Sequence, residues 1–291
     1  MLVWVQRLVL VLLVWTSSAL AQPAWVALPA DELRSQLATL DVVAQRQWLQ
    51  DAYANQALLQ ANDAQLMAVL QTLDTRTLFF PARQWLQRNP DYSYSMLRQE
   101  RLPHDNVLPT LPERMQVRYR HAPRAIYVLW QAGGARAGQE ILYDAALDAK
   151  HVRTHAGGFI SRLIFNVAID GMLARTQSRH SVRAIGFQYL LDQLDTDLAK
   201  LKSLSVREQT TVRVVHDSGK RYLEFVFQTP GEPDFYAPTT RMQLDLQRPV
   251  VRLVESQDAE GQVFERTLFE QVSSQPLPAD AFDPNNPQYR F

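Results

Sequence analysis

Apolar residues recur at steps of three and four from Asp31 to about Asp74, the spacing of one face of an α-helix. Asn62 and Asp63 are typical capping residues and divide this stretch. We therefore predict two amphipathic helices. Their apolar faces consist of Leu33, Leu37, Leu40, Ala44 and Trp48 in the first helix and Leu66, Val69, Leu70 and Leu73 in the second. Neither has a basic face, which favours packing on a protein core over lying on lipid.

After a turn-rich stretch around Pro81 and Asn89, the period changes from 3.6 to 2, which is typical of β-strands. Four strands are predicted, over residues 92–101, 113–120, 125–131 and 140–144. In the second strand Met115, Val117 and Tyr119 alternate with polar residues. This alternation is expected of a sheet with one face in water.

The helical period returns over residues 182–202, where leucines fall on one stripe. Five further strands are predicted, over residues 210–216, 221–229, 241–247, 250–257 and 263–272. Gly219 and Gly261 stand in turns between them, where hairpins need positive φ. Pro284 and Pro287 indicate that the last segment runs along the surface.

This order of elements predicts an α+β fold in a single domain. A strongly curved antiparallel sheet, shaped as a half-open barrel, would carry covering helices. Residues 22–90 would form an N-terminal helical segment that packs on the sheet. Residues 91–291 would form the curved sheet, with the helix near 182–202 inserted in it.

The first 21 residues resemble a cleavable export signal. Arg7 precedes a short apolar run, and small residues lead to a cleavage site that we place after Ala21. The alternative is a membrane anchor, but the uninterrupted apolar run is too short to span a bilayer. We expect a periplasmic protein with no transmembrane segment after cleavage.

Composition excludes several classes of function. Thirty basic residues balance thirty acidic ones, so no overall charge favours nucleic acid as a partner. The absence of cysteine excludes disulfides, thiolate metal sites and cysteine nucleophiles. Sixteen prolines against ten glycines weaken a nucleotide-binding interpretation.

Residues that could carry chemistry do not form a recognisable site. His151 and His155 would be about 13 Å apart on a strand, too far for one metal ion, and no third ligand is evident. We expect surface positions for the other histidines, namely His104, His121, His180 and His216. Acidic pairs such as Glu100 and Glu113 could do acid–base work only if the fold joins them. We therefore assign no catalytic residue, no metal and no cofactor.

The predicted strands are rich in aromatic and apolar residues. Packing in an ordinary core explains most of them. A strongly curved sheet can also leave an internal space for an apolar ligand. For such a cavity we predict a lining of Tyr127, Trp130, Tyr143, Phe225, Phe227, Met242 and Leu244.

Several segments resemble the bacterial family known as domain of unknown function 1571. They are Tyr94 to Arg101, Arg118, Pro123, Tyr127, Gly138 to Glu140, Tyr143, Arg179 to Val182, Ile185 with Gly186, and Phe282 to Tyr289. Gln139 departs from the family's usual arginine, and the loop 144–150 lacks an expected glycine. The resemblance covers roughly residues 91–291 and implies no activity. The architecture is similar to periplasmic lipoprotein carriers of the LolA type, whose half-open barrel shelters acyl chains.

Three hypotheses about function follow. The first is a non-enzymatic periplasmic carrier or binding protein for a lipid or lipid-modified ligand. The second is a cell-envelope interaction protein with a filled core, whose Arg114, Arg118 and Arg120 bind a partner protein or an anionic glycan. The third is a hydrolase that acts through carboxylates that the sequence cannot pair.

Overall fold

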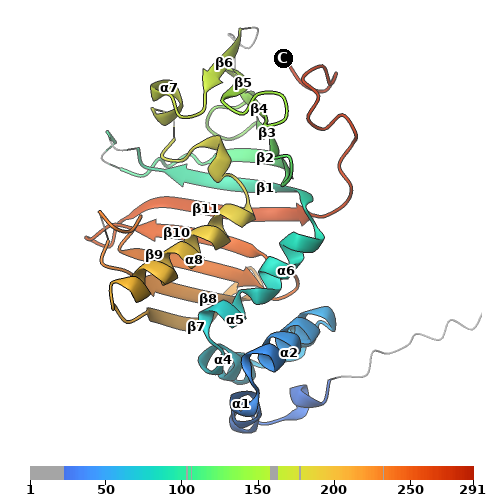
Figure 1. Ribbon diagram of the computed structural model, residues 1–291, viewed down its shortest axis with the longest axis vertical. Helices are drawn as coiled ribbons and strands as arrows, with labels where there is room; N and C mark the ends of the chain where they lie inside the picture. Colours follow the sequence, from blue (N-terminus) through green and yellow to red (C-terminus); the bar gives the residue numbers. More distant parts are fainter. Residues whose placement is uncertain (1–22, 103, 106, 158–162, 177, 232) are drawn as a thin grey trace, which may run out of the picture.

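The computed structural model describes residues 23–291 except 103, 106, 158–162, 177 and 232 (Figure 1). The predicted signal peptide and its cleavage site after Ala21 lie outside the described residues. Among the described residues, no helix has the length and the apolar character needed to cross a membrane.

The N-terminal part of the described chain is helical, and its helices are shorter than the sequence pattern predicts. Asp41 accepts a hydrogen bond from the backbone of Ala44 at 2.8 Å and starts a new helix inside the first predicted one. The predicted cap at Asn62 is confirmed, because its side chain and that of Gln65 form a reciprocal capping box. The elements are η1 (Ala24–Ala27), α1 (Ala30–Thr39), α2 (Val42–Ala54), α3 (Ala57–Gln60), α4 (Asp63–Thr72), α5 (Thr75–Leu78) and α6 (Phe80–Arg88).

The turn predicted around Pro81 is wrong, since this residue lies in the first turn of α6. The first backbone N–H groups of a helix have no partner within it, so proline is tolerated there. Helix α6 ends at Arg88 and is capped by Asn89, whose side-chain amide donates to the carbonyl of Trp85 at 2.7 Å.

Eleven strands form one antiparallel sheet among the described residues. They are β1 (Asp91–Glu100), β2 (Glu113–Arg120), β3 (Ala125–Trp130), β4 (Glu140–Asp144), β5 (His151–His155), β6 (Ile164–Ala168), β7 (Gln209–Asp217), β8 (Lys220–Gln228), β9 (Thr239–Asp245), β10 (Val251–Gln257) and β11 (Val263–Ser273). Their order is β6-β5-β4-β3-β2-β1-β11-β10-β9-β8-β7. The first and last strands of that order are edges, so the sheet stays open. The predicted α+β class with an open antiparallel sheet is confirmed.

The predicted helix over residues 182–202 is a 3₁₀ turn, η3 (Val182–Ala184), followed by α8 (Phe187–Ser203). Gly186 separates the two with a φ of 115°. A Cβ at this position would lie 2.7 Å from the ring of Tyr119, so only glycine fits. The hydroxyl of Tyr92 then accepts a hydrogen bond from the first N–H of α8 at 3.0 Å. These contacts fix the start of α8 on the sheet.

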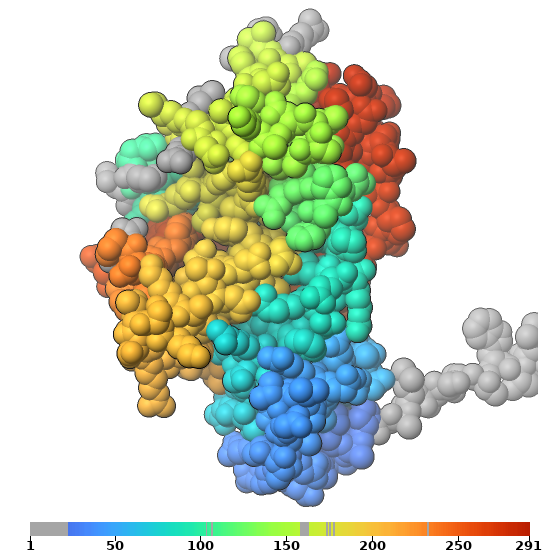
Figure 2. Space-filling view, in the orientation of Figure 1, coloured from blue at the N-terminus to red at the C-terminus, as the bar shows by residue number. Residues whose placement is uncertain are grey.

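Helices α6 and α8 cross the same face of the sheet (Figure 1). In the space-filling view of this face, atoms of α8 and of the segment before it cover the middle of the sheet (Figure 2). A continuous apolar core lies beneath, and it also includes residues of α1, α2 and α4. Within it, the rings of Phe79 and Phe225 have centroids 4.9 Å apart.

The C-terminal segment packs on the opposite face of β3 and β4. Ala281, Phe282 and Tyr289 form a separate apolar cluster there with Tyr127 and Leu142. Tyr289 stacks on Tyr127 with ring centroids 3.9 Å apart. The two faces of the sheet therefore have different covers, helices on one and the end of the chain on the other.

Candidate ligand-binding site between helix α8 and the sheet

Two cavities lie on the helix-covered face of the sheet. The first, here called the α8 cavity, has a volume of about 130 Å³ and lies between α8 and strands β1 and β8 to β11. Its apolar lining includes Met96, Leu190, Leu194, Phe227, Met242 and Phe269. A dry cavity of about 150 Å³ can hold a small apolar molecule such as benzene.

The second, here called the Trp130 cavity, has a volume of about 280 Å³. It lies between strands β1 to β6 and the chain leading from β6 to α8, which includes the short helix α7 (Met172–Arg175). Its apolar lining includes Met115, Trp130, Ile141, Val152, Val167 and Ile169. The volume is close to the lower end of the range of about 300–1,000 Å³ for small-molecule sites.

Arg98, His180 and Ile185 line both cavities. Arg98 is on β1 at the middle of the sheet, and the two other residues belong to the chain that leads into α8. The cavities are therefore neighbours that meet at a polar boundary.

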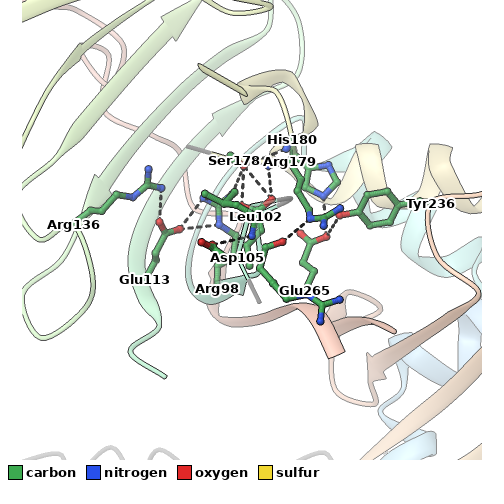
Figure 3. A network of polar contacts seen from close by, with 12 residues as sticks. Arg98, Leu102, Asp105, Glu113, Arg136, Ser178, Arg179, His180, Tyr236 and Glu265 are labelled. Atoms are coloured by element: carbon green, nitrogen blue, oxygen red, sulfur yellow. Dashed lines mark hydrogen bonds and ion pairs between the residues drawn. The ribbon is translucent and has the colours of Figure 1, made fainter. Parts of the chain in front are cut away.

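A network of buried charged groups forms this boundary (Figure 3). The guanidinium of Arg98 donates from Nε and Nη2 to Oε2 of Glu113, at 2.8 and 2.7 Å, and its Nη2 lies 3.8 Å from Oε2 of Glu100. Arg136 pairs with the other oxygen of Glu113. Glu100 accepts from the hydroxyl of Ser178 at 3.0 Å. The fold thus brings Glu100 and Glu113 close together, as acid–base catalysis by this pair would require, but the guanidinium of Arg98 lies between the two carboxylates.

His180 and Glu265 form the second half of the network. His180 Nε2 lies 2.9 Å from Oε2 of Glu265, which also accepts from the hydroxyl of Tyr236 at 2.5 Å. Burial lowers the pKa of His180, but the hydrogen bond and charge of Glu265 and the charge of Glu100 raise it overall above its ordinary value of 6.5. Burial raises the pKa of Glu265, and its bond to His180 brings it below the ordinary 4.5. The pair therefore favours its charged form.

The surface position expected for His180 is wrong, because its side chain is only 17% exposed. Glu100, His180 and Glu265 also place three potential metal ligands within 4.8 Å of one another. These donors already have hydrogen-bond partners, and the Arg98 guanidinium beside Glu100 opposes a further cation. The arrangement is better suited to hold the boundary between the cavities than to bind a metal ion.

The seven residues predicted to line a cavity divide into three groups. Trp130 lines the Trp130 cavity, and Phe227 and Met242 line the α8 cavity. Tyr143, Phe225 and Leu244 are buried in the core on the same face. Tyr127 is on the opposite face, against Tyr289. It lies three residues before Trp130 on β3, and side chains an odd number of residues apart on one strand point to opposite sides of the sheet.

Buried polar atoms on two uncharged residues of the cavity walls have no hydrogen-bond partner among the described residues. They are the hydroxyl of Tyr94, in the α8 cavity, and the indole N–H of Trp130. Tyr94 is 2% exposed and Trp130 is 3% exposed. Buried polar groups normally have partners, so both atoms could bind an acceptor inside a cavity.

Two of the three arginines considered for partner binding contact the C-terminal segment. Arg118 donates to the hydroxyl of Tyr289 at 2.9 Å, and Arg120 lies 4.8 Å from the ring centroid of Phe282. Arg114 is exposed. Arg118 and Arg120 therefore help to hold the end of the chain on the sheet.

His151 and His155 both lie on β5, the strand next to the edge strand β6. His151 bonds to Asp148 at 2.9 Å, whereas His155 is fully buried with Nε2 3.5 Å from Glu140. The two rings have different partners and do not form a joint site.

Sequence reasoning missed Glu265 and the role of Arg98 and His180. Arg98, Glu100 and His180 belong to the segments on which the family resemblance depended, and this was the one available signal. Glu265 belongs to a predicted strand with ordinary alternation, and it meets His180 across 85 positions of the chain.

Comparison with solved structures found weak similarities. An uncharacterized conserved protein from Thermus thermophilus is 10% identical, with a TM-score of 0.40, over 71% of this chain and 94% of that one. MucB is 14% identical, with a TM-score of 0.41, over 70% of this chain and 62% of that one. A LolA superfamily protein from Nitrosomonas europaea is 9% identical, with a TM-score of 0.32, over 73% of this chain and 99% of that one. At these values the likenesses say nothing about function.

Comparison with curated proteins found no match. The family described as "Protein of unknown function (DUF1571)" matches residues 89–291. This range agrees with the part of the chain for which the sequence resemblance was predicted, and it covers well over half of the chain. The protein belongs to the DUF1571 family.

Proposed function

We propose that the protein is a non-enzymatic binding protein or carrier that shelters an apolar chain of a lipid or lipid-modified ligand. The observation that carries this proposal is the pair of adjacent apolar cavities between the sheet and the segment from β6 through α8. The export signal predicted from the sequence would take the protein to the periplasm. Binding of this kind needs no cofactor, because burial of apolar surface drives it.

The expected strength of binding follows from the hydrophobic effect. Each buried methylene contributes about 0.8 kcal/mol, so ten sheltered methylenes contribute about 8 kcal/mol before the costs of ordering. If no such cost were subtracted, −8 kcal/mol would correspond to a dissociation constant of about 1 μM, so this value is the tightest binding that we expect. A chain held only in part would bind more weakly, which is compatible with reversible loading.

The proposal is tested by filling a cavity. Val254 on β10 is partly buried and lines the α8 cavity, so Val254→Trp places an indole in the space proposed for the chain. We expect at least a tenfold loss of affinity for dodecanoate, measured by isothermal titration calorimetry. The matched control is Val43→Trp on α2, where the side chain is 75% exposed and does not line either of the two cavities. Absence of dodecanoate binding by the native protein would contradict the proposal, and equal, unchanged binding by both variants would exclude the α8 cavity as the site.

Binding of a protein partner is the second candidate, and exposed apolar side chains at the β6 edge favour it. Ile164, Phe165 and Met172 are 41%, 47% and 83% exposed. An edge strand with such side chains can pair with a strand of another protein. In that case Ile164→Lys should abolish recovery of an envelope protein and leave dodecanoate binding unchanged, whereas Val254→Trp should do the reverse.

A further inference from the structure

The indole N–H of Trp130 is a buried donor that belongs to a residue in the wall of a cavity. Trp130 is on β3, and its side chain is 3% exposed. Its Nε1 has no acceptor among the described residues, and the indole lines the Trp130 cavity. An indole nitrogen can only donate, so the group that completes this site must be a hydrogen-bond acceptor.

The charged side chains that line the Trp130 cavity are all basic. They are Arg98, Arg136 and His180, and no aspartate or glutamate is among its lining residues. The guanidinium of Arg136 lies 4.7 Å from the ring centroid of Trp130, so a positive charge is next to the unpartnered donor. Ser178 and Ser181 add hydroxyl groups to the same wall.

The carboxylates of the network line a different space. Glu100 and Glu113 line a neighbouring pocket of about 320 Å³, which shares Arg98 and Arg136 with the Trp130 cavity. The α8 cavity differs as well, because Glu265 and Asp197 line it. Among these three spaces, the Trp130 cavity alone combines basic groups with an apolar wall and contains no acidic side chain.

We propose that the Trp130 cavity binds the anionic head group of an amphiphile, a carboxylate or a phosphate monoester, whose apolar chain occupies the rest of the site. The head-group oxygens accept the hydrogen bond of Trp130 Nε1 and lie beside the guanidinium groups of Arg98 and Arg136. Met115, Ile141 and Val152 contact the first part of the chain. This inference rests on the proposed function and adds the chemical class of the ligand to it.

The experiment compares three ligands with the same chain and different head groups. Dodecanoate, dodecyl phosphate and 1-dodecanol are titrated into the full-length mature protein by calorimetry. We expect at least one of the two anions to bind about tenfold more tightly than the alcohol, and the stronger of them identifies the head group. Equal binding of all three overturns the inference and leaves the proposed function standing. Binding by none of them overturns both.

A pair of conservative variants locates the head group. Trp130→Phe keeps an aromatic ring and removes the N–H, so we expect about a fivefold loss of affinity for the preferred anion and a smaller loss for 1-dodecanol, whose uncharged oxygen is a weaker acceptor. Trp85→Phe is the matched control, because Trp85 packs on Tyr92 and Phe187 outside this cavity. If Trp130→Phe changes the affinity for the anion and for the alcohol equally, or changes neither, the anion does not bind at Trp130.

Discussion

Removal of Arg98 is the most informative perturbation of the boundary between the cavities. Its side chain is 9% exposed, and those of Glu100 and Glu113 are 6% and 17% exposed. Arg98→Met would leave Glu100 with neutral donors, the hydroxyl of Ser178 and the backbone N–H of Arg179. Glu113 would keep its ion pair with Arg136.

The magnitude follows from the distances. Two unit charges about 4 Å apart interact by about 4 kcal/mol at an effective dielectric constant of 20. The separation of 3.8 Å between Arg98 and Glu100 is in this range, and the contacts with Glu113 are shorter. Truncating one member of a buried pair typically lowers the free energy of unfolding by about 3–5 kcal/mol. We expect this loss for Arg98→Met.

A double-mutant cycle distinguishes a charge effect from lost packing. Glu100→Gln removes the negative charge that Arg98→Met leaves without its arginine partner, so it should be much less destabilising in the Arg98→Met background than in the native protein. We expect a coupling energy of about 1–3 kcal/mol between the two sites. The assay is urea denaturation of all four proteins, with the midpoint compared at constant m-value. Additive effects of the two substitutions would refute the reasoning.

Three further predictions concern single residues. Gly186→Ala should lower the free energy of unfolding by about 1–3 kcal/mol through backbone strain alone, because φ is 115° at this position. The Cβ of the alanine would also contact the ring of Tyr119. Thermal denaturation measures this loss, and an unchanged melting temperature would contradict the prediction. Phe225→Ala should cost about 3–5 kcal/mol, since the ring is fully buried; a loss below 1 kcal/mol in urea denaturation would show that the site is not tightly packed. The pKa of His180 is raised above 6.5, so the stability that its charged form provides is complete below that pH and is lost as pH rises through the folded-state pKa. The difference in free energy of unfolding between the native protein and His180→Gln should therefore shrink as the pH rises above 6.5, and a constant difference would argue against the charged pair with Glu265.

The sequence predicted the strands well because their alternation is local. The bounds of β2 and β4 agree with the prediction at both ends, since each has a clear alternation or clear turns beside it. Strand β6 was missed, and most of its residues are exposed, so no alternation between buried and exposed positions marks it. The prediction at Pro81 was wrong because proline is common both in turns and in the first turn of a helix.

The site was harder to predict because it depends on long-range contacts. Period 2 shows that Tyr127 and Trp130 point to opposite faces, but it does not show which face the helices cover. The C-terminal Tyr289 settles this for Tyr127 by stacking on it from 162 residues away in the chain. Likewise, nothing local to His180 or Glu265 indicates their 2.9 Å contact. The sequence identifies candidate residues one at a time, but it does not show which of them are in contact in the folded protein.

The location of a bound chain tests the central claim most directly. Crystals of the mature protein grown with 12-bromododecanoate would place the bromine atom by its anomalous scattering. The account predicts a bromine peak inside the α8 cavity or the Trp130 cavity, within van der Waals contact of residues such as Met242 or Ile141. Bromine peaks found only on the outer surface, for example beside the exposed Ile164 and Met172, would contradict it.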